Sequence, residues 1–100
     1  MQEGADPAAP GREAEEAAGS DGVRNLVEFL CRALAAEPDG VQVEAVEEGG
    51  GLVLEVSVEG DDLGRLIGRG GRVANAIRTV AKAAARSAGE GRVLVEFLED

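Results

Sequence analysis

Glycines and arginines alternate over a short stretch in the second half of the chain, and this combination can bind phosphate. The stretch from Ile67 to Arg72 reads IGRGGR. Its glycines permit positive φ angles and let an anionic backbone approach closely, while Arg69 and Arg72 could donate charge-assisted hydrogen bonds to phosphate oxygens. A helix that begins directly after the stretch would also aim unpaired N–H groups at an anion. These residues therefore predict a phosphate-binding loop.

The charge of the chain is distributed unevenly. The 100 residues include 20 acidic and 10 basic side chains, and the net charge of −10 by itself disfavours a nucleic-acid partner. Residues 64–86 nevertheless contain no acid and six bases, which are Arg65, Arg69, Arg72, Arg78, Lys82 and Arg86. Such segregation concentrates a positive field on one site. Arg65 could instead pair with Asp61 or Asp62 one turn away. Arg78, Lys82 and Arg86 could form only a solvated surface, and Gly68, Arg69 and Gly71 could form only a turn that connects two helices.

Other chemistries find few candidate residues. The Gly-Lys-Ser/Thr ending of a P-loop is missing, and Val73 stands where a dinucleotide fingerprint needs its third glycine. Because the chain has no histidine, one cysteine and no clustered carboxylates in an apolar setting, we predict no metal, no cofactor and no enzymatic activity. Two aromatic residues, Phe29 and Phe97, leave little for stacking against bases.

The single cysteine, Cys31, cannot form an internal disulfide. It lies close to the apolar face of a predicted helix, so we interpret it as a small core residue. A reducing, cytoplasmic location follows from the same cysteine usage. No stretch approaches the 18 consecutive apolar residues that indicate a membrane span, so no membrane association is predicted.

The hydrophobic pattern predicts six elements around the loop. A helix begins at Ser20 or Asp21 and ends before Pro38. Two antiparallel strands at 41–45 and 52–58 are joined by a loop at 47–51, and Val46 marks either a bulge or fraying near the turn. A short helix follows and ends near Gly68 because four glycines lie between residues 64 and 71. A longer helix begins near Gly71 or Arg72 and ends at residue 88, and a strand covers 92–98.

The longer helix has two distinct faces. One arc carries the apolar residues Val73, Ile77, Val80, Ala81, Ala84 and Ala88, and a separate arc carries Arg72, Arg78, Lys82 and Arg86. The element order α-β-β-α-α-β predicts an α+β fold with a three-stranded sheet and helices packed on one face. Residues 21–100 would form this single domain. Residues 1–20 contain no Val, Leu, Ile or Phe, and we predict a disordered acidic tail there.

On these elements and the IGxxG motif, the chain resembles a KH domain of the bacterial type II arrangement, and in particular the KhpA family of small bacterial KH proteins. The resemblance covers Val23 to Leu98. It implies that Gly68 and Gly71 are the fixed glycines of the loop, that Arg69 and Gly70 are its variable residues, and that Ile67 packs beneath it. Leu66 and Val73 would contribute to an apolar groove floor. Many family members carry a basic or polar residue at the position of Gly70.

The resemblance implies a function and partners. KH loops clamp the backbone of about four single-stranded nucleotides. We expect an RNA-binding protein that acts in post-transcriptional regulation or as an RNA chaperone, with a role in cell elongation and cell-wall biogenesis. It would form a homodimer, or a heterodimer with a KhpB (Jag, EloR) protein. The expected RNA-binding residues are Arg65, Ile67, Gly68, Arg69, Gly70, Gly71, Arg72, Arg78 and Lys82. Alternatives are an adaptor that dimerises through the KH fold and a ribosome assembly factor.

Overall fold

The computed structural model of the protein describes residues 20–99. Its elements are α2 (Ser20–Leu34), β2 (Gln42–Glu48), β3 (Gly51–Ser57), α3 (Asp62–Ile67), α4 (Arg72–Ser87) and β4 (Arg92–Phe97), with short 3-10 turns at Pro38–Gly40 and Arg69–Gly71. The predicted α-β-β-α-α-β order is confirmed. The predicted acidic tail lies outside the described residues, apart from Ser20, which is the first residue of α2. None of the helices within residues 20–99 is long and apolar enough to span a membrane.

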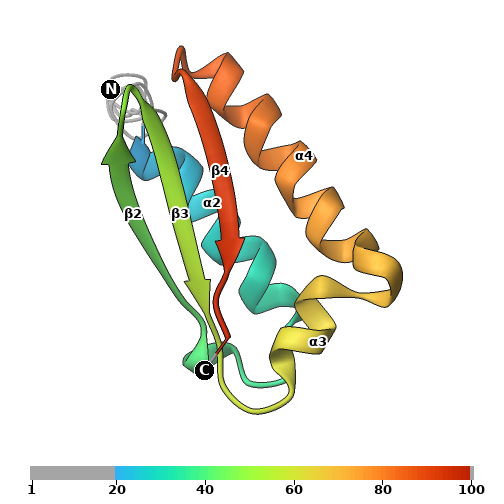
Figure 1. The fold of residues 1–100 in the computed structure, drawn as a ribbon. Helices are drawn as coiled ribbons and strands as arrows, with labels where there is room; N and C mark the ends of the chain where they lie inside the picture. The colour runs from blue at the N-terminus through green and yellow to red at the C-terminus, as the bar shows by residue number, and fades with distance from the viewer. Residues whose placement is uncertain (1–19, 100) are drawn as a thin grey trace, which may run out of the picture.

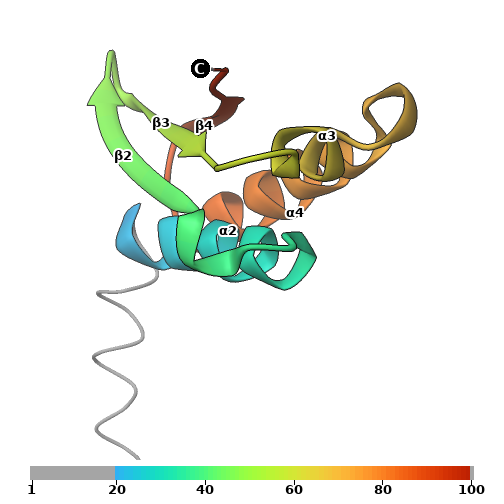
Figure 2. The same cartoon turned by 90° about the horizontal axis from the view of Figure 1, so that it is seen from below.

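The three strands form one mixed sheet, and the helices cover one of its faces. The strand order is β2-β3-β4, with β2 antiparallel and β4 parallel to β3. Figures 1 and 2 show α2 and α4 side by side on the same face of this sheet. Helix α3 lies at the end of the molecule where β3 ends and α4 begins. This arrangement confirms the predicted three-stranded α+β fold with helices on one face.

The hairpin between β2 and β3 is tighter than the sequence pattern predicts. Its turn consists of Gly49 and Gly50, whose φ angles of 54° and 79° are both positive, as a two-residue type I′ turn requires. Strand pairing therefore continues up to Glu48 opposite Gly51. The predicted bulge at Val46 is wrong, because Val46 pairs regularly with Val53.

The core lies between the helix layer and the inner sheet face. Its fully buried side chains include Val27, Cys31, Leu54 and Leu66, which confirms Cys31 as a core residue. The buried face of α4 overlaps the predicted apolar arc only in part: Ile77 and Ala81 are buried as predicted, and Ala74 and Ala85 are buried in addition. This face is rotated by about 50° on the helical wheel.

The rotation of α4 has a packing cause. The helix contacts both α2 and β4, and its small alanines allow all three elements to approach closely. Val80 is consequently left 41% exposed.

Candidate nucleic-acid interface

Helix α3, which precedes the predicted loop, is anchored by a buried carboxylate. Asp62 is 1% exposed and accepts hydrogen bonds from the backbone N–H groups of Ala36 and Glu37, both at 2.9 Å, and from Nη1 of Arg65 at 3.1 Å. These contacts hold the pKa of Asp62 below its usual value, with the backbone hydrogen bonds from Ala36 and Glu37 as the largest causes. The Arg65 contact acts in the same direction, and burial opposes it. The N-terminus of α3 is therefore fixed to the segment that follows α2.

The loop itself has the backbone conformation that its glycines predict. Helix α3 ends at Ile67, and the N–H of Gly68 donates to the carbonyl of Gly64 at 2.8 Å. Gly68, Gly70 and Gly71 have φ angles of 77°, 64° and 78°, a region that is costly for residues with a Cβ atom. The N–H of Gly71 donates to the carbonyl of Gly68 at 3.1 Å. The chain thus reverses within a few residues and enters α4 at Arg72.

The glycines of the loop differ in their surroundings. Gly68 lies against Val73 and has no room for a side chain, whereas Gly70 and Gly71 face open space. The open side lets another backbone approach the loop closely. Beneath it, Ile67 and Val73 are half-buried, but Leu66 is fully buried. Leu66 therefore packs in the core, and the expectation that it lines a groove floor is wrong.

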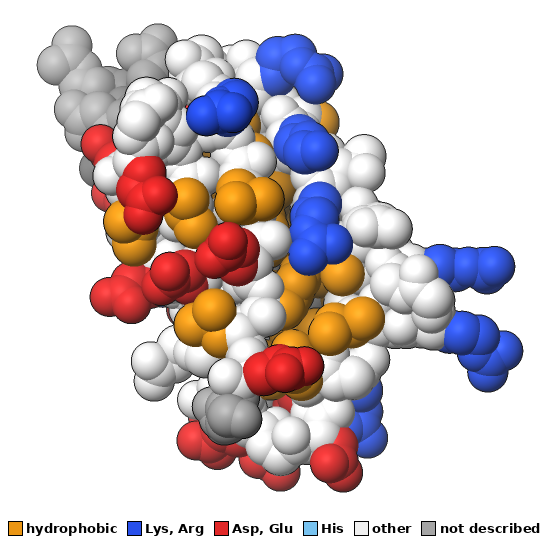
Figure 3. All heavy atoms as spheres, viewed as in Figure 1, with side chains coloured by type: hydrophobic (Ala, Val, Ile, Leu, Met, Phe, Trp, Pro, Cys, Tyr) orange, Lys and Arg blue, Asp and Glu red, His pale blue; other side chains and the backbone are white. Residues whose placement is uncertain are grey.

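The predicted basic residues fall into two groups. Arg69, Arg72, Lys82 and Arg86 are exposed and form no ion pair with any other residue in the described part of the chain. Figure 3 shows Lys and Arg side chains gathered on the α4 side of the molecule, while the acidic ones lie mainly over the sheet and at the opposite end from the α4 C-terminus. The basic side chains predicted from the charge pattern therefore lie on one side of the molecule, at the loop and along α4.

The second group consists of Arg65 and Arg78, which are held by protein contacts. Arg65 pairs with Asp62, one of its two predicted alternatives. Arg78 donates from Nε to the carbonyl of Val95 at 3.2 Å, and its guanidinium carbon lies 5.4 Å from the ring centroid of Phe97. Arg65 therefore pairs within α3 and Arg78 joins α4 to β4, and any contact of theirs with RNA stays a prediction.

Two residues near the interface have no clear signal in the sequence. The sequence indicated Asp62 only as a possible partner of Arg65, because its backbone partners at Ala36 and Glu37 are 26 and 25 residues away. Arg92 lies beyond the acid-free stretch and is separated from it by Glu90. Its position opposite Gly51 in the parallel pair of strands places it beside α4, and knowledge of the strand order would have revealed it.

The described part of the chain offers little for covalent or metal chemistry. Within residues 20–99, no group of three or more His, Cys, Asp or Glu side chains lies close enough to hold a metal ion. Cys31 is buried, and burial raises its pKa to about 11. Its thiol is therefore protonated at neutral pH and lies away from the loop.

Comparison with known proteins identifies the family. The KH-domain model described as KhpA/KhpB, KH domain matches residues 24–97. The RNA-binding protein KhpA of Clostridium acetobutylicum is 42% identical over 76 residues, which cover 76% of this chain and 100% of that protein. The RNA-binding protein KhpA of Mycobacterium tuberculosis is 47% identical over 58 residues, which cover 58% of this chain and 72% of that protein. The KhpA of Aquifex aeolicus is 36% identical over 77 residues, which cover 77% of this chain and 96% of that protein. No solved structure gives a significant match. The chain therefore belongs to the KhpA/KhpB family of KH-domain proteins.

Proposed function

We propose that this protein binds single-stranded RNA and that the loop from Gly68 to Gly71 clamps the RNA backbone. The observation that carries the proposal is the exposed turn of positive-φ glycines between Arg69 and Arg72, at the start of a 16-residue helix. The first N–H groups of a helix have no partner within it and favour a bound anion. Relatives named RNA-binding protein KhpA support the choice of ligand.

The surface chemistry predicts how this binding behaves. Arg69 and Arg72 are exposed and can reach phosphate oxygens, while neither aromatic side chain belongs to the loop. Affinity should therefore come mainly from phosphate contacts and should fall as salt increases, with a slope of about −0.7 per neutralised phosphate on a single strand. Sequence preference should be weak, since a KH unit contacts only about four nucleotides.

The protein is not an enzyme, since the family to which it belongs is a non-enzymatic one. The proposal also includes a cellular role: the protein acts in the cytoplasm, in post-transcriptional regulation or as an RNA chaperone.

The proposal further includes pairing with a second KH protein, which is either another copy of this chain or a KhpB-type partner. Exposed apolar side chains on the helices support pairing, because Phe29 on α2 is 69% exposed and Val80 on α4 is 41% exposed. The same side chains favour, as a second candidate, an adaptor function through dimerisation.

The test of the proposal compares two forms of one RNA. A fluorescent single strand of about ten nucleotides and the same strand annealed to its complement are titrated with the full chain at low and at physiological salt. We expect tighter binding of the single strand and weaker binding at higher salt. Equal binding of both forms, or no binding of either, contradicts the proposal. A second variant, Phe29→Asp, tests the adaptor function. If α2 carries the dimer surface, sedimentation should show that this variant no longer self-associates, while titration should show that it still binds RNA.

A further inference from the structure

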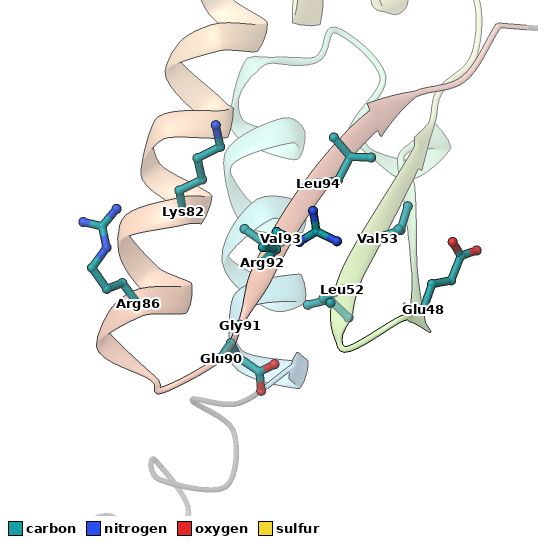
Figure 4. A pocket seen from close by; sticks show the side chains of 11 residues that line it. Glu48, Leu52, Val53, Lys82, Arg86, Glu90, Gly91, Arg92, Val93 and Leu94 are labelled. Atoms are coloured by element: carbon teal, nitrogen blue, oxygen red, sulfur yellow. The ribbon is translucent and has the colours of Figure 1, made fainter.

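A pocket lies at the end of α4 that is far from the glycine loop. It encloses about 630 Å³ and is lined by the C-terminal half of α4, by the first residues of β3 and β4, and by Glu48 at the end of β2. Figure 4 shows Lys82 and Arg86 on α4 at one side of the pocket and Arg92, Val93 and Leu94 on β4 beside them. The pocket is therefore open both to the basic side of α4 and to the outer face of the sheet.

The lining of the pocket combines cations with an apolar floor. Lys82, Arg86 and Arg92 are all exposed, and none forms an ion pair with another residue of the described chain. Val53 and Leu94 are direct neighbours on adjacent strands, and Leu94 is 51% exposed. The lining also contains two acids, Glu48 and Glu90, which lie at its rims in Figure 4, at the end of β2 and in the turn before β4. Positive charge thus borders an exposed apolar surface.

The pocket lies on the same side of α4 as the exposed basic residues of this helix. Arg72, Lys82 and Arg86 fall on one arc of α4, about 120° wide, and Arg92 extends the same side onto β4. From Arg72 to Arg86 the helix rises by about 21 Å at 1.5 Å per residue. Four nucleotides stacked as in a duplex span about 14 Å at 3.4 Å each. A strand that keeps this stacked spacing must therefore be longer than four nucleotides to reach from the loop to the pocket.

We propose that this pocket is a second RNA subsite, in which Lys82, Arg86 and Arg92 bind phosphates of nucleotides outside the clamped segment and Val53 and Leu94 contact one of their bases. A nucleotide carries an anionic phosphate next to a base whose flat faces are apolar, and the pocket offers cations next to an apolar surface. Arg92 can also stack its guanidinium plane on a base, as arginines do with unpaired RNA bases. The subsite rests on the proposed RNA binding and deepens it, because it predicts a dependence of affinity on RNA length.

The experiment uses two probes and two charge-matched variants of the full chain. The probes are fluorescent oligouridylates of four and of about twelve nucleotides. The test variant, Arg86→Gln with Arg92→Gln, removes two pocket charges. The control variant, Arg24→Gln with Arg32→Gln, removes two charges on α2 that are paired with Glu28. Circular dichroism checks that both variants are folded.

We expect the test variant to bind the long RNA about tenfold more weakly than the wild type, with a salt slope smaller by about 1.4. Its affinity for the tetranucleotide and both affinities of the control variant should stay within about twofold of the wild type. If the test variant binds the long RNA as the wild type does, or if the control loses as much, the subsite is wrong and the loop clamp stands. If the wild type binds neither probe, both proposals are overturned.

Discussion

Gly68 and Val73 touch so closely that the loop leaves no space for a side chain at residue 68. A Cβ atom on Gly68 would lie 2.5 Å from Cγ2 of Val73 and 2.9 Å from its backbone nitrogen. Val73 belongs to the first turn of α4, so the contact fixes the end of α3 against the start of α4. The proposed clamp therefore depends on a glycine at residue 68 for steric as well as conformational reasons.

Gly68→Ala should destabilise the protein more than Gly70→Ala. Both glycines have positive φ angles, which cost a residue with a Cβ atom about 1–2 kcal/mol, but only Gly68 would also meet neighbouring atoms. We expect Gly70→Ala to lower the free energy of unfolding by about 1 kcal/mol and Gly68→Ala by more than about 2 kcal/mol. Urea denaturation measures both. Equal losses in the two variants would show that the contact with Val73 is unimportant.

Asp62→Asn should destabilise the protein at neutral pH and flatten its acid dependence. The pKa of Asp62 is lowered by its hydrogen bonds to the backbone of Ala36 and Glu37. The stabilisation by this carboxylate is therefore complete above its unfolded pKa of about 4 and is lost as the pH falls through the lower folded value. The difference in free energy of unfolding between wild type and variant should shrink below about pH 4. The control is Asp61→Asn, which changes the exposed neighbouring residue. If the free-energy difference between wild type and Asp62→Asn stays constant with pH, the carboxylate of Asp62 does not supply this stabilisation.

Arg78 and Lys82 should separate stability from RNA binding. Arg78 contacts the carbonyl of Val95 and the ring of Phe97, so Arg78→Ala should lower the free energy of unfolding by about 1 kcal/mol. Lys82 is exposed, and Lys82→Ala should change stability by less than about 0.5 kcal/mol while weakening RNA binding. Thermal unfolding and RNA titration of both variants measure the two effects. A loss of stability in Lys82→Ala as large as that in Arg78→Ala would contradict this division.

Residues that act through their own backbone conformation could be predicted from the sequence. The glycines at 68, 70 and 71 stop one helix and precede the next wherever the rest of the chain lies, so the loop was located correctly. The acid-free run of bases likewise identified the positive surface, because neighbours on one helix face remain neighbours in any fold.

Features that depend on distant partners could not be predicted. The contacts of Asp62 with Ala36 and of Arg78 with Val95 join separate elements, and the parallel pairing that places Arg92 beside α4 has no local signal. The buried face of α4 was predicted only in part for a related reason. Hydrophobicity favoured Val80, whereas close packing against two neighbours also buries the small residues Ala74 and Ala85.

Cys31 should resist thiol reagents in the folded protein. Its side chain has no exposed surface, and burial raises its pKa to about 11, so the reactive thiolate is almost absent at neutral pH. We expect no modification by iodoacetamide under native conditions and complete modification in denaturant, as mass spectrometry would show. Rapid modification of the native protein would mean that α2 opens readily from the sheet.

The central claim, that the Gly68–Gly71 loop clamps RNA, is tested most directly by adding negative charge to the two exposed residues of the loop. The test variant carries two substitutions in the loop, Arg69→Asp and Gly70→Asp. The control variant carries Arg32→Asp and Ala33→Asp, which make the same charge change at exposed positions on α2. Binding of a single-stranded RNA of about ten nucleotides is measured across a salt series, and circular dichroism checks the fold. Our account predicts that the loop variant loses at least about tenfold in affinity and has a shallower salt slope, while the α2 variant stays close to wild type. A folded loop variant that binds RNA as tightly as the wild type would contradict the clamp.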